Sequence, residues 1–396
     1  MKHMPEGWRW VRLEDVFQRI QRTIKTDVEN VLSITARVGF VDQAEKFGRV
    51  IAGKNLERYI LLRHGEFAYN KGNSNSYPQG CIYMLEEFEQ GAVPNVYYCF
   101  RATSSEVCTE FYKFYFESGA LNSQLRRLIN SGVRNDGLLN LPADHFFRVR
   151  IPLPPIDEQR RIAEVLRDAD ANIVDIEDAI AAAEQIRKGF LERFICELEQ
   201  VPPTRLNKAL IRIKREVEID LKQLYYQIGI RSHGKGIFHK EPFTGQELGN
   251  KRIYWVEPGD FVLNIVFAWE GAVALVSENE RGMCGSHRFP TFEFNTDICL
   301  PEFLLFYFKT PTGVRQLEDV SPGGAGRNKT LNQGDFLKLK ISLPDLEVQQ
   351  EIVVSLQTHT DAILTMQAEA ASLREVKRGL MQGLLSGQVR TQTIRS

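Results

Sequence analysis

The chain has 396 residues, of which 43% are hydrophobic, 26% charged and 10% aromatic. This composition excludes a disordered tail and a collagen-like fibre, and the length suffices for about two to three domains. No run of 18 or more apolar residues occurs, so we expect no membrane span, and the N-terminal residues lack the apolar region of a signal peptide. Six scattered cysteines without a CxxC pair argue against a structural zinc site and fit a cytoplasmic protein.

The net charge of −1 conceals an uneven distribution. Residues 157–199 contain 12 acidic and 6 basic residues, and residues 345–390 contain 6 and 4, which leaves +7 for the rest of the chain. Long solvated helices are often acidic, and this is the simpler interpretation. The alternative is that the basic parts bind a polyanion such as nucleic acid.

The chain contains an internal repeat. A shift of 190 residues aligns residues 151–191 with 341–381 without a gap, and 9 of the 41 positions are identical. The regions before these segments also resemble each other, since residues 65–70 match 259–264. The repeat predicts the order globular unit, helix, globular unit, helix.

The globular units combine strand and helix patterns, which indicates an α+β fold class. Alternating apolar and polar residues predict strands, and runs rich in aromatic residues predict short helices. The predicted strands are 97–100, 146–151 and 261–266, and the predicted helices are 111–116 and 303–308.

Each repeat ends in a long helix whose apolar residues alternate in steps of three and four, as in a coiled-coil seam. The predicted seam residues are Ile162, Leu166, Ile173, Ile176 and Ile180 in the first helix, and Ile352, Leu356, Ile363, Met366 and Leu373 in the second. The stripe continues through Ile186 and through Val376. Each helix would have roughly 40 residues and a length of about 60 Å. We expect the two helices to pack together; the alternative is that each packs on its own domain.

The chain lacks the motifs of common enzymes. Residues 229–236 have the spacing of a phosphate-binding loop, but Gly236 occupies the position of the magnesium-binding Ser or Thr, so we expect a flexible basic loop. No methyltransferase tetrapeptide, dinucleotide fingerprint or metal-ligand spacing of histidines occurs. We therefore predict no catalytic residue and no metal site in this chain.

Three motifs together resemble a known family. They are Pro5-Glu6-Gly7-Trp8, the proline–glutamine motif at Ile151–Ala163 and its diverged copy at Ile341–Val353. The arrangement resembles the specificity (S) subunit of type I restriction–modification systems, from Gly7 to about Gln388. In the second copy Ser342, Asp345 and Val348 replace two prolines and the glutamate, so we expect the local contacts there to differ from those of the first copy.

The resemblance implies two target-recognition domains that each read one half of a bipartite double-stranded DNA target. The helices would pair as an antiparallel coiled coil, set the length of the spacer and bind two methyltransferase subunits. Motor–nuclease subunits would complete an ATP-dependent endonuclease. The chain itself would be non-catalytic, and S-adenosylmethionine, ATP and Mg would bind only the partner subunits.

The resemblance also implies a division into four regions. The recognition domains would be residues 1–150 and 200–340, and the helical spacer regions 151–199 and 341–390. The acidic helices would be repelled by DNA and suit contacts with protein, whereas the basic domains would supply phosphate contacts.

Candidate DNA-binding residues are polar residues in loops with glycine and aromatic neighbours. Arg and Lys can contact guanine or phosphate, and Asn can read adenine. In the first unit they are Arg37, Lys71, Asn73, Asn75, Arg134 and Asn135, and in the second Arg231, His233, Lys235, Trp269, Arg288, Arg327, Asn328 and Lys329. Each could instead be an ordinary surface or turn residue.

Three other functions remain possible from the sequence. The chain could be a protein-interaction scaffold without a role on DNA, a nuclease with an unrecognised site, or an orphan specificity subunit without active partners. Steeply salt-dependent DNA binding would exclude the scaffold, and cleavage of DNA by the purified chain with magnesium would indicate the nuclease.

Overall fold

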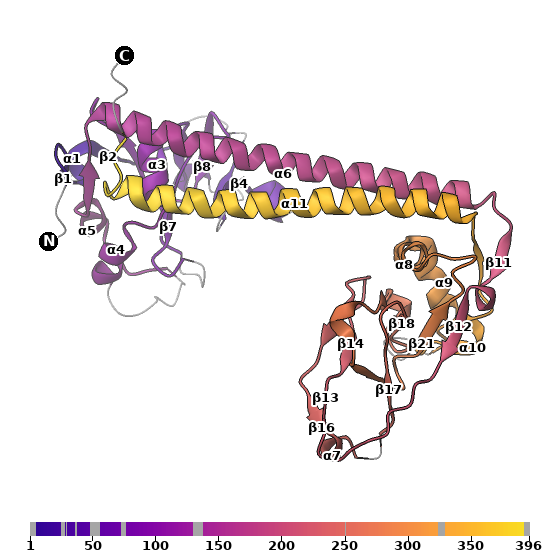
Figure 1. The fold of residues 1–396 in the computed structure, drawn as a ribbon. Helices are drawn as coiled ribbons and strands as arrows, with labels where there is room; N and C mark the ends of the chain where they lie inside the picture. The colour runs from indigo at the N-terminus through magenta and orange to yellow at the C-terminus, as the bar shows by residue number, and fades with distance from the viewer. Residues whose placement is uncertain are drawn as a thin grey trace. The chain divides into compact units, whose positions relative to one another are not determined.

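The computed structural model describes residues 5–24, 28, 30–35, 38–47, 56–72, 77–129, 138–249, 251–323 and 329–391. The chain divides into two compact units. Unit 1 comprises residues 1–177 and 368–396, and unit 2 comprises residues 178–367. Two long helices, α6 (Ile156–Leu198) and α11 (Leu346–Leu385), contribute to both units (Figure 1). In the described ranges no helix has the length and apolar character needed to cross a membrane.

Unit 1 is built on a four-stranded antiparallel sheet. Its strand order is β2 (Phe17–Ile20), β9 (Tyr98–Ala102), β6 (Phe67–Asn70) and β7 (Cys81–Met84). Helix α3 (Thr109–Glu117) packs on this sheet. The ring of Phe67 meets those of Phe17 and Phe116 edge to face at centroid distances of 5.7 and 5.4 Å, and the rings of Phe17 and Phe116 are tilted at 6.1 Å. These aromatic contacts join α3 to the core of unit 1.

Smaller elements complete unit 1. The two-stranded ladders are β1 (Arg9–Arg12) with β10 (Arg150–Leu153), β3 (Leu32–Thr35) with β4 (Gly39–Asp42), and β5 (Ile60–Arg63) with β8 (Gln90–Val93). The short helices are α1 (Leu13–Val16), α2 (Gln43–Phe47), η1 (Leu56–Arg58), α4 (Asn122–Leu128) and α5 (Ala143–Phe147).

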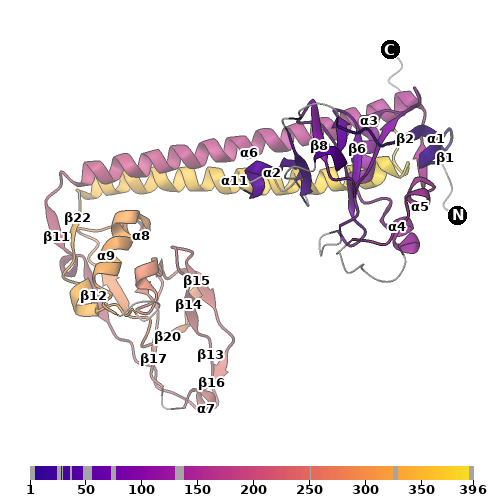
Figure 2. The same cartoon turned by 180° about the vertical axis from the view of Figure 1, so that it is seen from behind.

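Unit 2 has the same plan (Figure 2). Its four-stranded antiparallel sheet has the order β12 (Leu210–Ile213), β21 (Thr291–Phe294), β18 (Phe261–Leu263) and β19 (Val273–Leu275). Strand β18 and helix α8 (Pro301–Lys309) correspond to β6 and α3 of unit 1. The predicted α+β class is confirmed, and the repeat is visible in the order of the strands.

The remaining elements of unit 2 surround this sheet. The two-stranded ladders are β11 (Pro203–Arg205) with β22 (Lys340–Ser342), β13 (Leu224–Tyr225) with β16 (Phe243–Thr244), β14 (Ile228–Ile230) with β15 (Ile237–His239), and β17 (Ile253–Trp255) with β20 (Cys284–Ser286). The short helices are η2 (Leu206–Lys208), α7 (Gly245–Leu248), η3 (Ala268–Glu270), η4 (Glu278–Glu280), α9 (Pro311–Asp319) and α10 (Gln333–Phe336).

Within each unit, α6 and α11 lie side by side and run antiparallel (Figures 1 and 2). Of the ten predicted seam residues, Ile162, Leu166, Ile173, Ile352, Leu356 and Ile363 are buried, and Ile176, Ile180, Met366 and Leu373 are half-buried. The helix ends join the globular cores, since Leu166 belongs to the core of unit 1 and Leu356 to that of unit 2. Each helix therefore has two kinds of partner, the other helix and a sheet-based domain.

The predicted apolar stripe was wrong at Ile186 and Val376, although it resumes at Phe194 and Leu384, which are buried. Ile186 and Val376 are 61% and 54% exposed. The half-buried positions are one residue further along, at Arg187 and Lys377. Arg187 lies four residues after Ala183, and Lys377 lies four residues after Leu373. The three-four spacing therefore continues without a phase shift, but charged residues occupy the seam.

Two local predictions also need correction. The run 146–151 was predicted as a strand, but Phe146 and Phe147 belong to α5 and the strand begins at Arg150. Both phenylalanines are buried, which an alternating strand would not allow. The stretch 229–236, predicted as a flexible loop, is largely the turn of the β14–β15 hairpin, closed by a hydrogen bond from Arg231 N to Gly236 O of 3.0 Å.

At the start of α6, Glu158 is held by two residues that are distant in sequence, Trp8 and Arg390. Glu158, only 3% exposed, accepts a hydrogen bond from Trp8 Nε1 at 3.0 Å. Arg390 donates to the same carboxylate through Nε at 2.7 Å and Nη2 at 2.9 Å. In the second copy Val348 stands at the position of Glu158 and is 43% exposed. The departure from the motif therefore corresponds to the loss of a buried ion pair.

Candidate nucleic-acid interface

Unit 2 contains an open hollow of about 1010 Å³. The β14–β15 hairpin, helix α7 and the segments that follow β18 and β20 supply its lining. The hollow thus combines segments that are distant in sequence, from Gln227 to Phe289.

The lining of the hollow is strongly basic. Five cations and two histidines contribute to it, namely Arg231, Lys235, Lys240, Lys251, Arg288, His233 and His287. The one acidic residue in the described lining is Glu247, which accepts hydrogen bonds from Thr244 N at 2.7 Å and Thr244 Oγ1 at 2.9 Å. These bonds lower the pKa of Glu247 and use its carboxylate to cap α7.

Two cations of the hollow lie against aromatic rings. In the described part of the chain none of the five forms an ion pair; Arg231 lies 5.1 Å from the ring centroid of Phe238, and Lys240 lies 4.8 Å from that of Phe289. Burial and then the charge of Arg288 lower the pKa of Lys240 from its ordinary value of 10.5. The positive charge of the hollow is therefore uncompensated, and an anion would be favoured there.

Other groups of the hollow suit the recognition of bases. Phe267 is 37% exposed and can stack on or contact a base or a methyl group. Asn264 is buried, and its Oδ1 accepts a hydrogen bond from Val266 N at 3.1 Å, which fixes the side chain at the end of β18. Cations for phosphates, arginine forks for guanine and apolar groups for thymine are the chemistry of a DNA reader.

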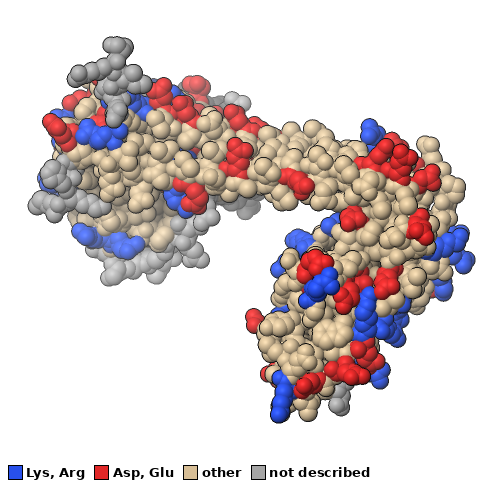
Figure 3. Space-filling view, in the orientation of Figure 1, with Lys and Arg blue, Asp and Glu red and all other residues tan. Residues whose placement is uncertain are grey.

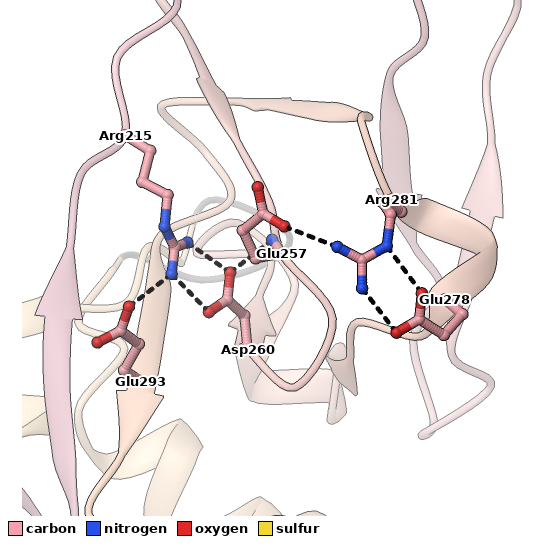
Figure 4. A network of polar contacts seen from close by, with 6 residues as sticks. All are labelled: Arg215, Glu257, Asp260, Glu278, Arg281 and Glu293. Carbon is pink, nitrogen blue, oxygen red and sulfur yellow. Dashed lines mark hydrogen bonds and ion pairs between the residues drawn. The ribbon is translucent and has the colours of Figure 1, made fainter.

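An ion-pair network supports the strands that lead to the hollow (Figure 4). Arg215, after β12, binds Asp260 through two hydrogen bonds of 2.6 and 3.0 Å and Glu293 of β21 at 2.6 Å. Asp260 is 2% exposed and also accepts from Glu257 N at 2.8 Å. The hydrogen bonds from Arg215 to Asp260 raise the pKa of the guanidinium. The network fixes β12, β18 and β21 relative to one another.

Unit 1 has the same support at the equivalent positions. Arg22 binds Glu66 through two hydrogen bonds of 3.0 Å, and Glu66 accepts from Arg63 N at 2.8 Å. Glu66 precedes β6 as Asp260 precedes β18. The two globular units are thus similar in a buried polar network as well as in strand order.

The structure gathers four predicted DNA-binding residues, Arg231, His233, Lys235 and Arg288, in the hollow of unit 2. Three others have partners elsewhere. Trp269 donates to Val266 O at 3.0 Å and lies 5.1 Å from Lys329 Nζ, and Lys329 pairs with Glu318. Lys71 donates to Tyr98 OH at 3.4 Å.

The remaining candidates lie outside the described residues. They are Arg37, Asn73, Asn75, Arg134, Asn135, Arg327 and Asn328. They stay predictions.

Sequence reasoning missed several residues of the hollow. Lys240, Lys251, His287, Phe238 and Phe267 line it but were not predicted. A signal existed for Phe238 and Lys240, since residues two apart in a strand share a face. No comparable signal existed for Phe267, which the fold alone brings opposite the hairpin.

Charge on the outer surface is less uniform than in the hollow. On the face seen in Figure 3, acidic and basic side chains alternate over unit 2, and the helices carry acidic patches among uncharged residues. The visible surface of unit 2 thus carries both signs of charge, whereas the described lining of the hollow has five cations and one acidic residue.

Comparisons with known proteins agree with this chemistry. Residues 247–375 match a family described as the type I restriction modification DNA specificity domain. The MjaX protein of Methanocaldococcus jannaschii, described as a type I restriction enzyme specificity subunit, is 21% identical over 98% of this chain and 95% of its own length. The type I restriction enzyme MjaVIII specificity subunit of the same organism is 20% identical over 67% of this chain and 68% of its own length.

Solved structures share the fold over almost the whole chain. A chain from a type I R-M system has a TM-score of 0.59 at 16% identity, covering 98% of this chain and 100% of that one. The HsdS subunit of Thermoanaerobacter tengcongensis has a TM-score of 0.53 at 17% identity, covering 98% of each chain. The S subunit of M. genitalium has a TM-score of 0.54 at 11% identity, covering 99% of this chain and 98% of its own.

Proposed function

We propose, from the premise that this chain belongs with the specificity subunits of type I restriction–modification systems, that it recognises double-stranded DNA by sequence. The observation that carries the proposal is the hollow of unit 2, in which five cations form no ion pair with any described residue and two of them lie against aromatic rings. The matched specificity domain, residues 247–375, contains part of its lining, including Arg288.

Each globular unit would read one half of a bipartite target. The shared strand order and the equivalent networks at Glu66 and Asp260 support this assignment, because they give both units the same frame. The long helices would set the distance between the half-sites, and their acidic surfaces would bind two methyltransferase subunits.

The chemistry would belong to the partners. Methylation with S-adenosylmethionine and ATP-dependent cleavage with Mg would take place in the methyltransferase and motor–nuclease subunits, in the cytoplasm. This chain would supply recognition without catalysis.

A selection experiment tests the proposal. The complex of this chain with its methyltransferase subunits is mixed with a random duplex library at moderate salt, and the bound duplexes are sequenced. We expect two short defined blocks around an undefined gap, and an affinity that falls steeply with salt. Salt-independent binding, or no enrichment by an intact complex, would favour a protein-interaction scaffold. A split motif bound without methyl transfer would indicate an orphan subunit.

A further inference from the structure

The two units differ in the charges present where the last turn of α3 or α8 approaches the long helices. Helices α3 and α8 are equivalent, because Gln159 bonds to Cys108 N just before α3 and Gln349 bonds to Leu300 N just before α8. Aligned from these positions, α3 ends at Glu117 and α8 ends at Lys309. The repeat likewise places Lys377 of α11 and Arg187 of α6 at equivalent seam positions.

In unit 1 this place holds charges of both signs. Lys377 donates to Asp170 on the facing helix and lies 5.6 Å from the ring centroid of Phe114. Glu117 interacts electrostatically with Lys113 and with Lys377. The two cations of this cluster, Lys113 and Lys377, therefore each have a carboxylate nearby.

In unit 2 the acidic members of this arrangement are replaced. Lys309 occupies the position equivalent to Glu117, and Thr360 the position equivalent to Asp170. The hydroxyl of Thr360 donates to Leu356 O at 2.8 Å. Arg187 remains, and its Nε is buried without a hydrogen-bond partner among the described residues. At the position where unit 1 has a cluster of acidic and basic residues, unit 2 has the two cations Arg187 and Lys309.

These two cations act on each other. Partial removal of the Lys309 ammonium from water, and then the charge of Arg187, lower the pKa of Lys309, and no carboxylate contributes to that shift. Like charges held together in partly desolvated positions cost folding free energy unless an anion joins them. Unit 1 shows that the same fold accommodates acidic residues here, so the fold does not require the repulsion.

The pair is continuous with the basic hollow. The stem of Lys309 crosses Gly234, where a Cβ atom would lie 2.8 Å from Lys309 Cγ. Gly234 belongs to the hairpin turn that carries Arg231, His233 and Lys235, and its N–H bonds to Gly271 O at 2.9 Å. Lys309 therefore lies beside the turn whose other face lines the hollow, between the hollow and Arg187 of α6.

We propose that Arg187 and Lys309 together bind a backbone phosphate of the DNA duplex that occupies the hollow of unit 2. The inference rests on the proposed DNA recognition and extends it to the spacer helix, which would contact DNA directly at Arg187 although α6 is acidic as a whole. A phosphate fits better than a carboxylate of a partner protein, because the turn that Lys309 crosses leads into the hollow.

The first variant gives unit 2 the acidic residue that unit 1 has at the equivalent position. Lys309→Glu recreates the Glu117 arrangement opposite Arg187, so it supplies the missing anion within the chain. We expect the variant complex to melt at the same temperature as the wild type or higher, and to bind the selected duplex roughly tenfold more weakly at moderate salt. The slope of log affinity against log salt should become shallower by about one for the lost phosphate contact.

Two further variants complete the design. Arg187→Gln should weaken binding of the selected duplex and of an unrelated duplex by similar factors, because a phosphate contact carries no sequence information. Lys188→Gln is the matched control, since Lys188 is the next residue of α6 but is 68% exposed and near Glu192. It should leave the slope and the affinity within about twofold of the wild type.

The outcomes separate this inference from the proposed function. If the wild-type complex binds no DNA in a salt-dependent way, the proposed function fails. If it binds DNA but Lys309→Glu and Arg187→Gln leave the slope unchanged, the phosphate site alone is wrong. If Lys309→Glu instead releases the methyltransferase subunits during size-exclusion chromatography, a carboxylate of a partner occupies the pair and the inference is overturned.

Discussion

Gln159 and Gln349 make the same three hydrogen bonds in the two units. The Oε1 of Gln159 accepts from Cys108 N at 2.9 Å, and its Nε2 donates to Glu106 O and Pro154 O, both at 2.8 Å. Gln349 does the same with Leu300 N at 2.8 Å, Ile298 O at 2.9 Å and Pro344 O at 2.7 Å. Through these hydrogen bonds each glutamine connects the first turn of a long helix to the segment before α3 or α8.

Truncation of either glutamine is expected to loosen only its own unit. Gln159→Ala leaves a buried N–H and two carbonyl groups without a partner, at a cost of about 1–3 kcal/mol for the buried donor alone. Hydrogen exchange should accelerate at the amide of Cys108 for Gln159→Ala and at that of Leu300 for Gln349→Ala. Gln185→Ala, an exposed position on α6, should change neither amide. Equal acceleration in both units would contradict this local role.

The Glu158 ion pair predicts an asymmetry between the repeats. Glu158→Ala leaves the buried Trp8 Nε1 and the half-exposed Arg390 without their carboxylate and should destabilise unit 1 by about 1–3 kcal/mol, chiefly because of the buried N–H. Val348→Ala, at the equivalent but exposed position, should cost less than about 0.5 kcal/mol. Urea unfolding followed by exchange at the amides of β1 and β11 measures the two effects separately. A similar loss for both variants would show that the ion pair adds nothing to unit 1.

The hollow predicts which arginines of unit 2 matter for DNA. Arg288→Gln removes an unpaired cation from the lining and should weaken duplex binding roughly tenfold. Arg281→Gln removes the same charge seven residues earlier, but Arg281 is bound to Glu278 at 2.8 Å outside the hollow. It should alter the affinity by less than about twofold. Fluorescence anisotropy at several salt concentrations distinguishes the variants, and equal losses would show a non-specific charge effect.

Lys240 predicts a pH dependence of DNA binding on the alkaline side. Its pKa is below 10.5 in the free protein because of burial and Arg288, whereas a bound phosphate would raise it again. Binding is then coupled to proton uptake, so affinity is constant while both states are protonated. It falls as the pH rises past the lowered pKa of the free protein. Lys240→Arg keeps its charge throughout this range and should flatten the profile, and an unchanged profile in that variant would exclude Lys240 as the titrating group.

Periodicity predicted the long helices because a regular three-four spacing over many turns has few other interpretations. It failed at Ile186 and Val376, where an apolar residue lies one position away from the seam and a charged residue occupies it. Apolar character alone could not reveal that Arg187 and Lys377 would occupy the seam, because the long stems of Arg and Lys can pack against apolar surface although their end groups are charged.

The hollow was predictable only in part. Arg231 and Lys235 follow each other in one hairpin turn, so a basic loop was visible in the sequence. Their proximity to Arg288 depends on the pairing of β14, β15, β17 and β20, which brings together residues far apart in the chain. The false strand at Phe146 has a related cause, since burial of neighbouring aromatic residues is decided by the tertiary core rather than by local alternation.

The pairing of the first and last strands has a consequence for how such proteins diversify. In each unit the entering strand lies against the leaving strand, β1 against β10 and β11 against β22. The residues between the two strands of each pair therefore begin and end at adjacent points of the unit. Under the proposed function, genetic recombination at these two points would replace all the intervening residues without altering the long helices, so one half of the target would change while the proposed contacts of the helices with partner subunits would not.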